Sequence, residues 1–290
     1  MNRCLAFLCA LMFAFVSVSS ACMAAPSDWI RFNLRAERGG SMIHADFHDE
    51  SRGHDENHWS SGFKPSELIG LDVNGFYQAQ ARPLRFSVVR EAGRLDCAGN
   101  GGGANASGNC SFSENPAFVQ TLSRRGIGRP SREQALGLMA LDVRRDLIDS
   151  LGTARFPTPT VDDLMSLTAV GVDRGYIDGL ANVGYRPKSV ETLTQFKALG
   201  VAPDWISGLV RVGYANLPSD ELMQLKALEV DGAFISGFQR AGYGRLPVDT
   251  LVQLKALGIT PEFARSVTGN AAAPPPVQQL VDMKLFGRRR

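Results

Sequence analysis

The residues best suited to chemistry in this chain are its four histidines, which lie within fifteen residues of one another. They are His44, His48, His54 and His58. Acidic residues stand among them, at Asp46, Asp49, Glu50, Asp55 and Glu56. Because imidazole and carboxylate groups together suit Zn²⁺, Cu²⁺ or Ni²⁺, this segment is the candidate metal site. No other pattern in the chain indicates a cofactor.

The alternative for this segment is a solvated polar loop. Residues 42–47 alternate in a way that predicts a strand. On a strand, His44 and His48 share a face but stand about 13 Å apart. Residues 49–57 predict an acidic surface loop. A metal site and a plain surface loop therefore both stay open.

No set of residues in the chain predicts catalysis. A serine or cysteine nucleophile would need its base from the histidine segment, because every histidine lies there. The glycines at 101–103 lack the Lys-Ser/Thr that completes a phosphate-binding loop, and their flanks predict strands, which favours a hairpin tip. We expect a protein that is not an enzyme.

The first residues predict export from the cytoplasm. Arg3 precedes an apolar run over residues 5–18, and small residues follow, as in a secretory signal peptide cleaved after Ala24. The run is short for a membrane span, so we expect no stable membrane insertion after cleavage. The alternative is a lipoprotein through Cys22, although Ser19 stands where that motif has a leucine-like residue. The expected location is the periplasm or the cell surface.

Export determines how the cysteines are interpreted. Three of the five lie within the predicted signal, and Cys97 and Cys110 remain in an oxidising compartment. They are predicted to form a disulfide between two strands, joined by a flexible glycine-rich loop over residues 99–108. A redox-active pair is the alternative, but it lacks the tight Cys-x-x-Cys spacing that tunes a thiolate.

An internal repeat of 29 residues is the strongest pattern in the chain. One place holds a small residue in every unit: Ala140, Ala169, Ala198, Ala227 and Ala256. The next place is apolar: Leu141, Val170, Leu199, Leu228 and Leu257. The place after it holds Asp142, Gly171, Gly200, Glu229 and Gly258. A further place is mostly aromatic: Leu147, Tyr176, Trp205, Phe234 and Phe263.

Each unit predicts two short helices. Helix-starting residues such as Ser131, Thr160 and Ser189 begin the first helix, and the recurrent glycine suits the left-handed position that ends it. Stacked hairpins of this kind can bury both of their apolar stripes. The predicted class is therefore α+β, with a small β-rich N-terminal domain that carries one disulfide hairpin, followed by an α-solenoid-like array of helical hairpins.

The predicted boundaries follow from these patterns. They are a signal peptide over 1–24, a β-rich domain over 25–115, the helical-hairpin repeat array over 116–270, and a Pro-rich linker with a basic tail over 271–290.

Two repeated places are candidates for binding. Lys197, Lys226 and Lys255 recur just before the repeated alanine and form the candidate partner-binding face. The alternative is a solvated edge whose aliphatic stems lie on apolar surface. The aromatic place could stack a ligand, but its spacing favours a row buried in the core.

The residues LVQLKALGITPEF, at 251–263, resemble a repeat of bacterial exported and membrane proteins. That repeat also occurs in the C-terminal tails of some membrane metallopeptidases similar to β-lactam sensors. The likeness covers about half of the chain, and small stand-alone proteins with a glycine-rich β region before the repeats are similar too. Those peptidases carry a zinc-binding His-Glu-x-x-His helix among membrane spans, and this chain has neither. The resemblance implies a helical-hairpin module on an envelope protein, without peptidase activity.

The formal net charge of +2 gives no reason to expect a nucleic-acid partner. We expect a non-catalytic exported envelope protein that uses its repeats as a scaffold or for protein–protein interaction, with another envelope protein as partner. The alternative is a metal-binding periplasmic protein that uses the segment from His44 to His58.

Overall fold

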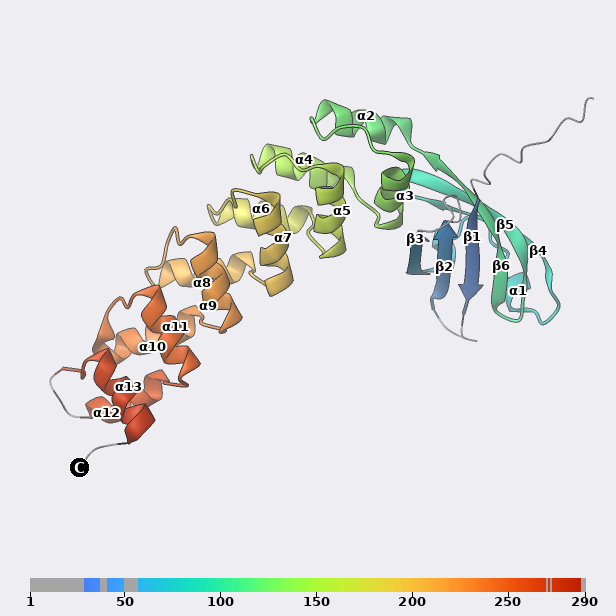
Figure 1. Cartoon of the computed structure of the whole chain (residues 1–290). Helices are drawn as coiled ribbons and strands as arrows, with labels where there is room; N and C mark the ends of the chain where they lie inside the picture. Colours follow the sequence, from blue (N-terminus) through green and yellow to red (C-terminus); the bar gives the residue numbers. More distant parts are fainter. Residues whose placement is uncertain (1–28, 37–40, 50–56, 270, 272, 288–290) are drawn as a thin grey trace, which may run out of the picture.

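The structure is a computed structural model of the chain, and it describes residues 29–36, 41–49, 57–269, 271 and 273–287. The predicted signal peptide, Cys22 and His54 lie outside these residues. An antiparallel sheet comes first and is followed by helices that lead away from it (Figure 1). The α+β class predicted from the sequence is confirmed.

Within the described residues, the strands form a six-stranded sheet with the order β3-β2-β1-β6-β5-β4, and all neighbours are antiparallel. The strands are β1 (Ile30–Arg35), β2 (Ile43–Asp49), β3 (Asn57–Phe63), β4 (Arg82–Val89), β5 (Gly93–Gly102) and β6 (Asn105–Glu114). The short helices η1 (Pro65–Glu67) and α1 (Val73–Tyr77) connect β3 to β4. One face of the sheet is apolar and buried, and the other carries polar side chains.

Both ends of the predicted acidic loop belong to strands. Residues 49–57 were expected to be a surface loop, but β2 extends to Asp49 and β3 begins at Asn57. Asp49 is only 5% exposed and accepts a hydrogen bond from Arg132 Nη1 at 3.3 Å. An aspartate in a polar sequence is expected at the surface. Asp49 can be buried because its carboxylate pairs with Arg132, a residue far along the chain.

The glycine-rich segment is a regular hairpin and not a flexible loop. Strands β5 and β6 run through it and leave only Gly103 and Ala104 as the turn, with φ values of 61° and 66°. Positive φ at both turn residues matches the right-handed twist of paired strands. Gly99 lies opposite Gly108, and a Cβ on either would collide with the backbone of the facing strand. These two glycines therefore permit close approach of the strands.

Cys97 and Cys110 form a disulfide across this hairpin, as predicted. They are directly opposite in the register of β5 and β6, with a Cα–Cα distance of 4.0 Å. Both cysteines are buried on the apolar face of the sheet.

The helices after the sheet fall into two rows (Figure 1). The first helices of the units contact one another in sequence: α3 (Arg132–Ala140), α5 (Val161–Ala169), α7 (Val190–Leu199), α9 (Ser219–Ala227) and α11 (Val248–Ala256). The second helices do the same: α4 (Arg145–Thr153), α6 (Arg174–Asn182), α8 (Pro203–Arg211), α10 (Gly232–Phe238) and α12 (Pro261–Thr268). Helix α2 (Pro116–Arg124) precedes α3, and η2 (Gln239–Tyr243) continues α10.

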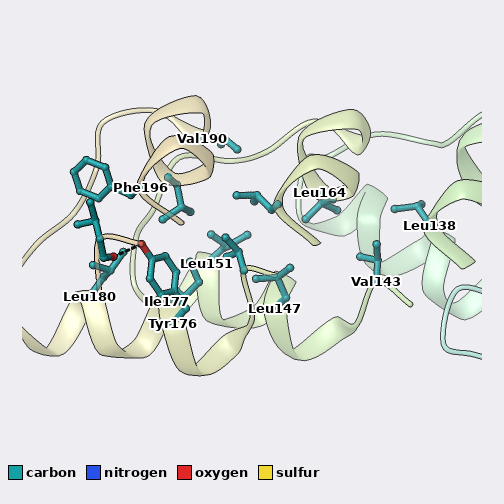
Figure 2. Packing of buried hydrophobic residues seen from close by; sticks show 14 of the residues in the cluster. Leu138, Val143, Leu147, Leu151, Leu164, Tyr176, Ile177, Leu180, Val190 and Phe196 are labelled. Atoms are coloured by element: carbon teal, nitrogen blue, oxygen red, sulfur yellow. Dashed lines mark hydrogen bonds between the residues drawn. The ribbon is translucent and has the colours of Figure 1, made fainter. Parts of the chain in front are cut away.

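Apolar side chains from both rows meet between them. Figure 2 shows part of this core, with these residues labelled: Leu138, Val143, Leu147, Leu151, Leu164, Tyr176, Ile177, Leu180, Val190 and Phe196. Leu164, Ile177 and Leu180 are 0% exposed. Because helices of this length are marginal alone, burial of this kind must supply most of their stability.

A left-handed residue follows each first helix at the place where the sequence predicts it. The φ values are 57° at Asp142, 81° at Gly171, 74° at Gly200, 55° at Glu229 and 61° at Gly258. The next residue in each unit is β-branched and at most 3% exposed, for example Val201, whose N–H bonds to Phe196 O at 2.8 Å. This is a Schellman stop, in which the turn places an apolar residue back against the helix.

The repeat continues beyond the predicted boundary at residue 270. Helix α13 (Val277–Phe286) begins 29 residues after α11, and Leu280 and Val281 stand in the register of Leu251 and Val252. Leu280 is 0% exposed and Val281 is 4% exposed. The segment that the sequence assigns to a linker and tail thus contains the first helix of a further unit.

Charged residues of the β4–β5 turn join the sheet to the array. Arg90 Nη1 donates to the carbonyls of Met139 and Ala140, at 2.8 and 2.5 Å, where α3 ends. Glu91 accepts from the backbone N–H of Arg145 at 2.9 Å, where α4 begins. A cation at a helix C-terminus and an anion at an N-terminus are both favoured by the helix dipoles. Burial lowers the pKa of Arg90, and Asp142 acts in the opposite direction.

The left-handed stop gives a prediction for stability. Glu229→Gly should raise the free energy of unfolding by about 0.5–1 kcal/mol, because glycine has no Cβ to strain at positive φ. Gly200→Glu should lower it by a similar amount. Urea denaturation of the full chain without its signal measures both. A loss of about 1 kcal/mol for Glu229→Gly, as for glycine inside a continuous helix, would show that the position is not left-handed.

The hairpin gives a second prediction. In protein exported to the periplasm, mass spectrometry should find the peptides of Cys97 and Cys110 linked, two hydrogens lighter than the free thiols. In the chain-entropy model the crosslink stabilises the fold by roughly 3 kcal/mol, so reduction should lower the denaturation midpoint. Free alkylation of both thiols in the native exported protein would contradict the prediction.

Candidate functional site

The described histidines lie on the polar face of the sheet, on strands β2 and β3. His48 is directly opposite His58, and their ring centroids are 4.5 Å apart. His58 Nε2 is 4.0 Å from Asp46 Oδ1, which also accepts a hydrogen bond from Ser60 Oγ at 2.5 Å. Strand pairing therefore brings two imidazoles and a carboxylate together.

This group of residues differs from the four-histidine set that the sequence suggests. His44 lies opposite Gly62, two places along β2 from Asp46, and His54 is outside the described residues. Among the residues that the structure describes, no group of three or more His, Cys, Asp or Glu side chains is arranged to hold a metal ion. The sequence could not reveal the pair, since its approach depends on the register of β2 with β3.

The repeated lysines lie on the repeated aromatic rings, each reaching back to the unit before its own. The ammonium to ring-centroid distances are 4.5 Å for Lys197 on Tyr176, 5.5 Å for Lys226 on Trp205, 5.0 Å for Lys255 on Phe234 and 5.6 Å for Lys284 on Phe263. Lys284, in α13, was not part of the predicted face. Cation–π contacts of this kind attract a lysine to the ring face.

The lysines also lie beside the left-handed turns. Lys255 Nζ donates to Glu229 O at 3.1 Å, and Cε of Lys226 stands 3.6 Å from the place of a Cβ on Gly200. A positive charge there complements the carboxyl end of the preceding helix. Lys197, Lys226 and Lys255 are half-buried. Their contacts join successive units to one another.

The aromatic place is partly a core position. Tyr176 is 8% exposed, its hydroxyl donates to Val201 O at 2.7 Å (Figure 2), and burial raises the pKa of its phenol. Trp205, Phe234 and Phe263 are half-buried beneath their lysines. The rings thus face the core on one side and a cation on the other.

An apolar row faces solvent beside the lysines. It occupies the place just before each left-handed residue: Leu141, Val170, Leu199, Leu228, Leu257 and, in α13, Phe286. Leu141 is 38% exposed, Leu199 is 43% exposed and Phe286 is 72% exposed, while the other three are half-buried. The sequence shows the row as a repeated apolar place. Only the solvent exposure of its side chains in the structure distinguishes it from the core positions.

Comparison with protein-family models, with curated proteins and with solved structures found no match to the chain. Over the described residues, no helix has the length and apolar character needed to cross a membrane.

Proposed function

We propose that this chain is an exported, non-catalytic envelope protein whose helical repeats form an α-solenoid that binds a protein partner. The observation that carries this proposal is the exposed apolar row from Leu141 to Phe286. An apolar side chain that recurs in every unit is usually a core residue, yet members of this row are up to 72% exposed. Stacked helices are about 8–10 Å apart, so the row offers one apolar contact at each such step.

Burying such a row against a partner is energetically favourable. Each apolar side chain removed from water contributes about 25 cal/mol per Å² of buried area. A contiguous apolar strip on an otherwise polar surface is typical of an interaction site. The half-buried lysines beside the row contact rings and a backbone carbonyl of the preceding unit.

Export is supported by three features of the chain. They are the predicted signal peptide over 1–24, the disulfide between Cys97 and Cys110, and the resemblance of residues 251–263 to repeats of bacterial envelope proteins. A disulfide persists in an oxidising compartment such as the periplasm.

The partner-binding proposal is tested with a charge-matched pair of double variants. Leu199→Glu with Leu228→Glu should abolish recovery of partners from envelope extract by the full chain without its signal. Gln195→Glu with Gln224→Glu adds the same charges at exposed places of α7 and α9, and should leave recovery unchanged. Crosslinking followed by mass spectrometry identifies the partners.

Circular dichroism checks that both double variants remain folded. If the partners recovered with the leucine variant match those of the unchanged chain, the apolar row is not the contact surface. If the glutamine variant loses them equally, added charge and not the row is responsible.

A second candidate function is metal binding by His48 and His58, favoured by their direct cross-strand contact. If it holds, calorimetry on the tag-free protein should detect saturable uptake of Zn²⁺, Cu²⁺ or Ni²⁺ in the low-micromolar range or tighter. His58→Ala should abolish the uptake. His44→Ala, on the same face but opposite Gly62, is the matched control and should retain it. No saturable uptake by the unchanged protein would remove this candidate.

A further inference from the structure

Strand β3 leaves one edge of the sheet open. Within the described residues it pairs with β2 alone, and no backbone hydrogen bond joins its other edge to another element. Its sequence, NHWSSGF, contains no Lys, Arg, Asp, Glu or Pro. Exposed edge strands usually carry such residues because they prevent the addition of another strand. Strand β3 lacks this protection.

A cleft lies beside the same strand. Its volume is about 640 Å³, and it runs between β3 and the helices α3 and α5. Apolar side chains from both sides line it: Trp59, Leu136, Leu141 and Met165. Trp59 stacks on Phe47 at 4.9 Å between ring centroids, which fixes one wall of the cleft.

The polar part of the cleft carries an exposed carboxylate. Asp162, at the start of α5, is exposed and accepts a hydrogen bond from Gln134 Nε2 at 2.8 Å. Among the described residues that line the cleft there is no lysine or arginine. The lining therefore complements a ligand that carries both an apolar and a basic side chain.

We propose that the open edge of β3 and the adjoining cleft bind an extended segment of a partner polypeptide. The segment adds to the sheet as a further strand, through alternate backbone N–H and C=O groups of β3. An apolar side chain enters the cleft among Trp59, Leu141 and Met165. A lysine or arginine of the segment lies near Asp162.

A foreign segment fits this edge better than a second copy of the chain. Strand β3 of another copy carries no lysine or arginine that could lie near Asp162, whereas a foreign segment can supply one. This inference goes beyond the proposed function, since it uses the sheet edge and stands whether or not the array binds its own partner.

The probe that tests it is a fluorescent octapeptide of alternating lysine and valine, with the full chain without its signal. Its matched control is the same peptide with alternate backbone nitrogens methylated, which keeps the side chains but removes N–H donors. Fluorescence anisotropy should show saturable binding of the first peptide. The methylated peptide should bind roughly tenfold more weakly or worse, because it cannot complete the strand ladder.

Repeat-matched variants then locate the site. Leu141→Asn and Asp162→Asn should each weaken binding, because they alter the cleft. Leu199→Asn and Asp220→Asn change the same places of the repeat two units away and should not. The inference is overturned if the unmodified peptide shows no saturable binding, if both peptides bind equally, or if both members of a variant pair lose affinity alike. A chain that is dimeric by sedimentation and loses the dimer on peptide addition would place a second copy at the edge instead.

Discussion

A left-handed backbone position at the end of each first helix is the constraint on which the array depends. The backbone must reverse there, and the residue that follows must return to the core, as Val201 does after Gly200. Helices of nine or ten residues result, and such helices are too short to be stable in isolation. They require neighbours on both sides, so the repeat of 29 residues, the two rows and the shared core all follow from where the chain is made to turn.

The first unit shows what these turns require electrostatically. In later units a lysine from the next unit lies over the end of the helix, as Lys255 does at Glu229 O. In the first unit that lysine place is held by Thr168, and the aromatic place is held by Leu147. Arg90 from the sheet bonds to the last carbonyls of α3 instead and lies 3.9 Å from Asp142. The sheet thus supplies a cation at the end of α3, where the next unit of the repeat supplies none.

Features set by local backbone chemistry were predictable from the sequence, and those set by distant partners were not. Helix starts, the left-handed position and the disulfide depend on residue type and spacing, and even Glu229 adopts the left-handed φ that the register predicts. The end of β2 at Asp49 was missed because the buried carboxylate pairs with Arg132, far along the chain. Strand β3 was missed because it forms by pairing with β2. The contact of His48 with His58 depends on strand register in the same way. Helix α13 was within reach, since Pro247 and Pro276, and likewise Lys255 and Lys284, are 29 residues apart, but the run of prolines before it suggested a linker.

Two repeated places at the ends of the first helices, two residues apart in the sequence, have different surroundings, although each recurs with the same period. The lysine place is polar, which suggests a surface for partners, yet its side chains are held by rings and carbonyls of the preceding unit. The leucine place is apolar, which suggests core, yet Leu141 and Leu199 are more exposed than a core residue would be. An interaction face should be sought where a repeated apolar residue is exposed to solvent. Such a side chain gains free energy when a partner removes it from water. By that criterion we propose the leucine row, in preference to the lysine row, as the contact surface for a partner.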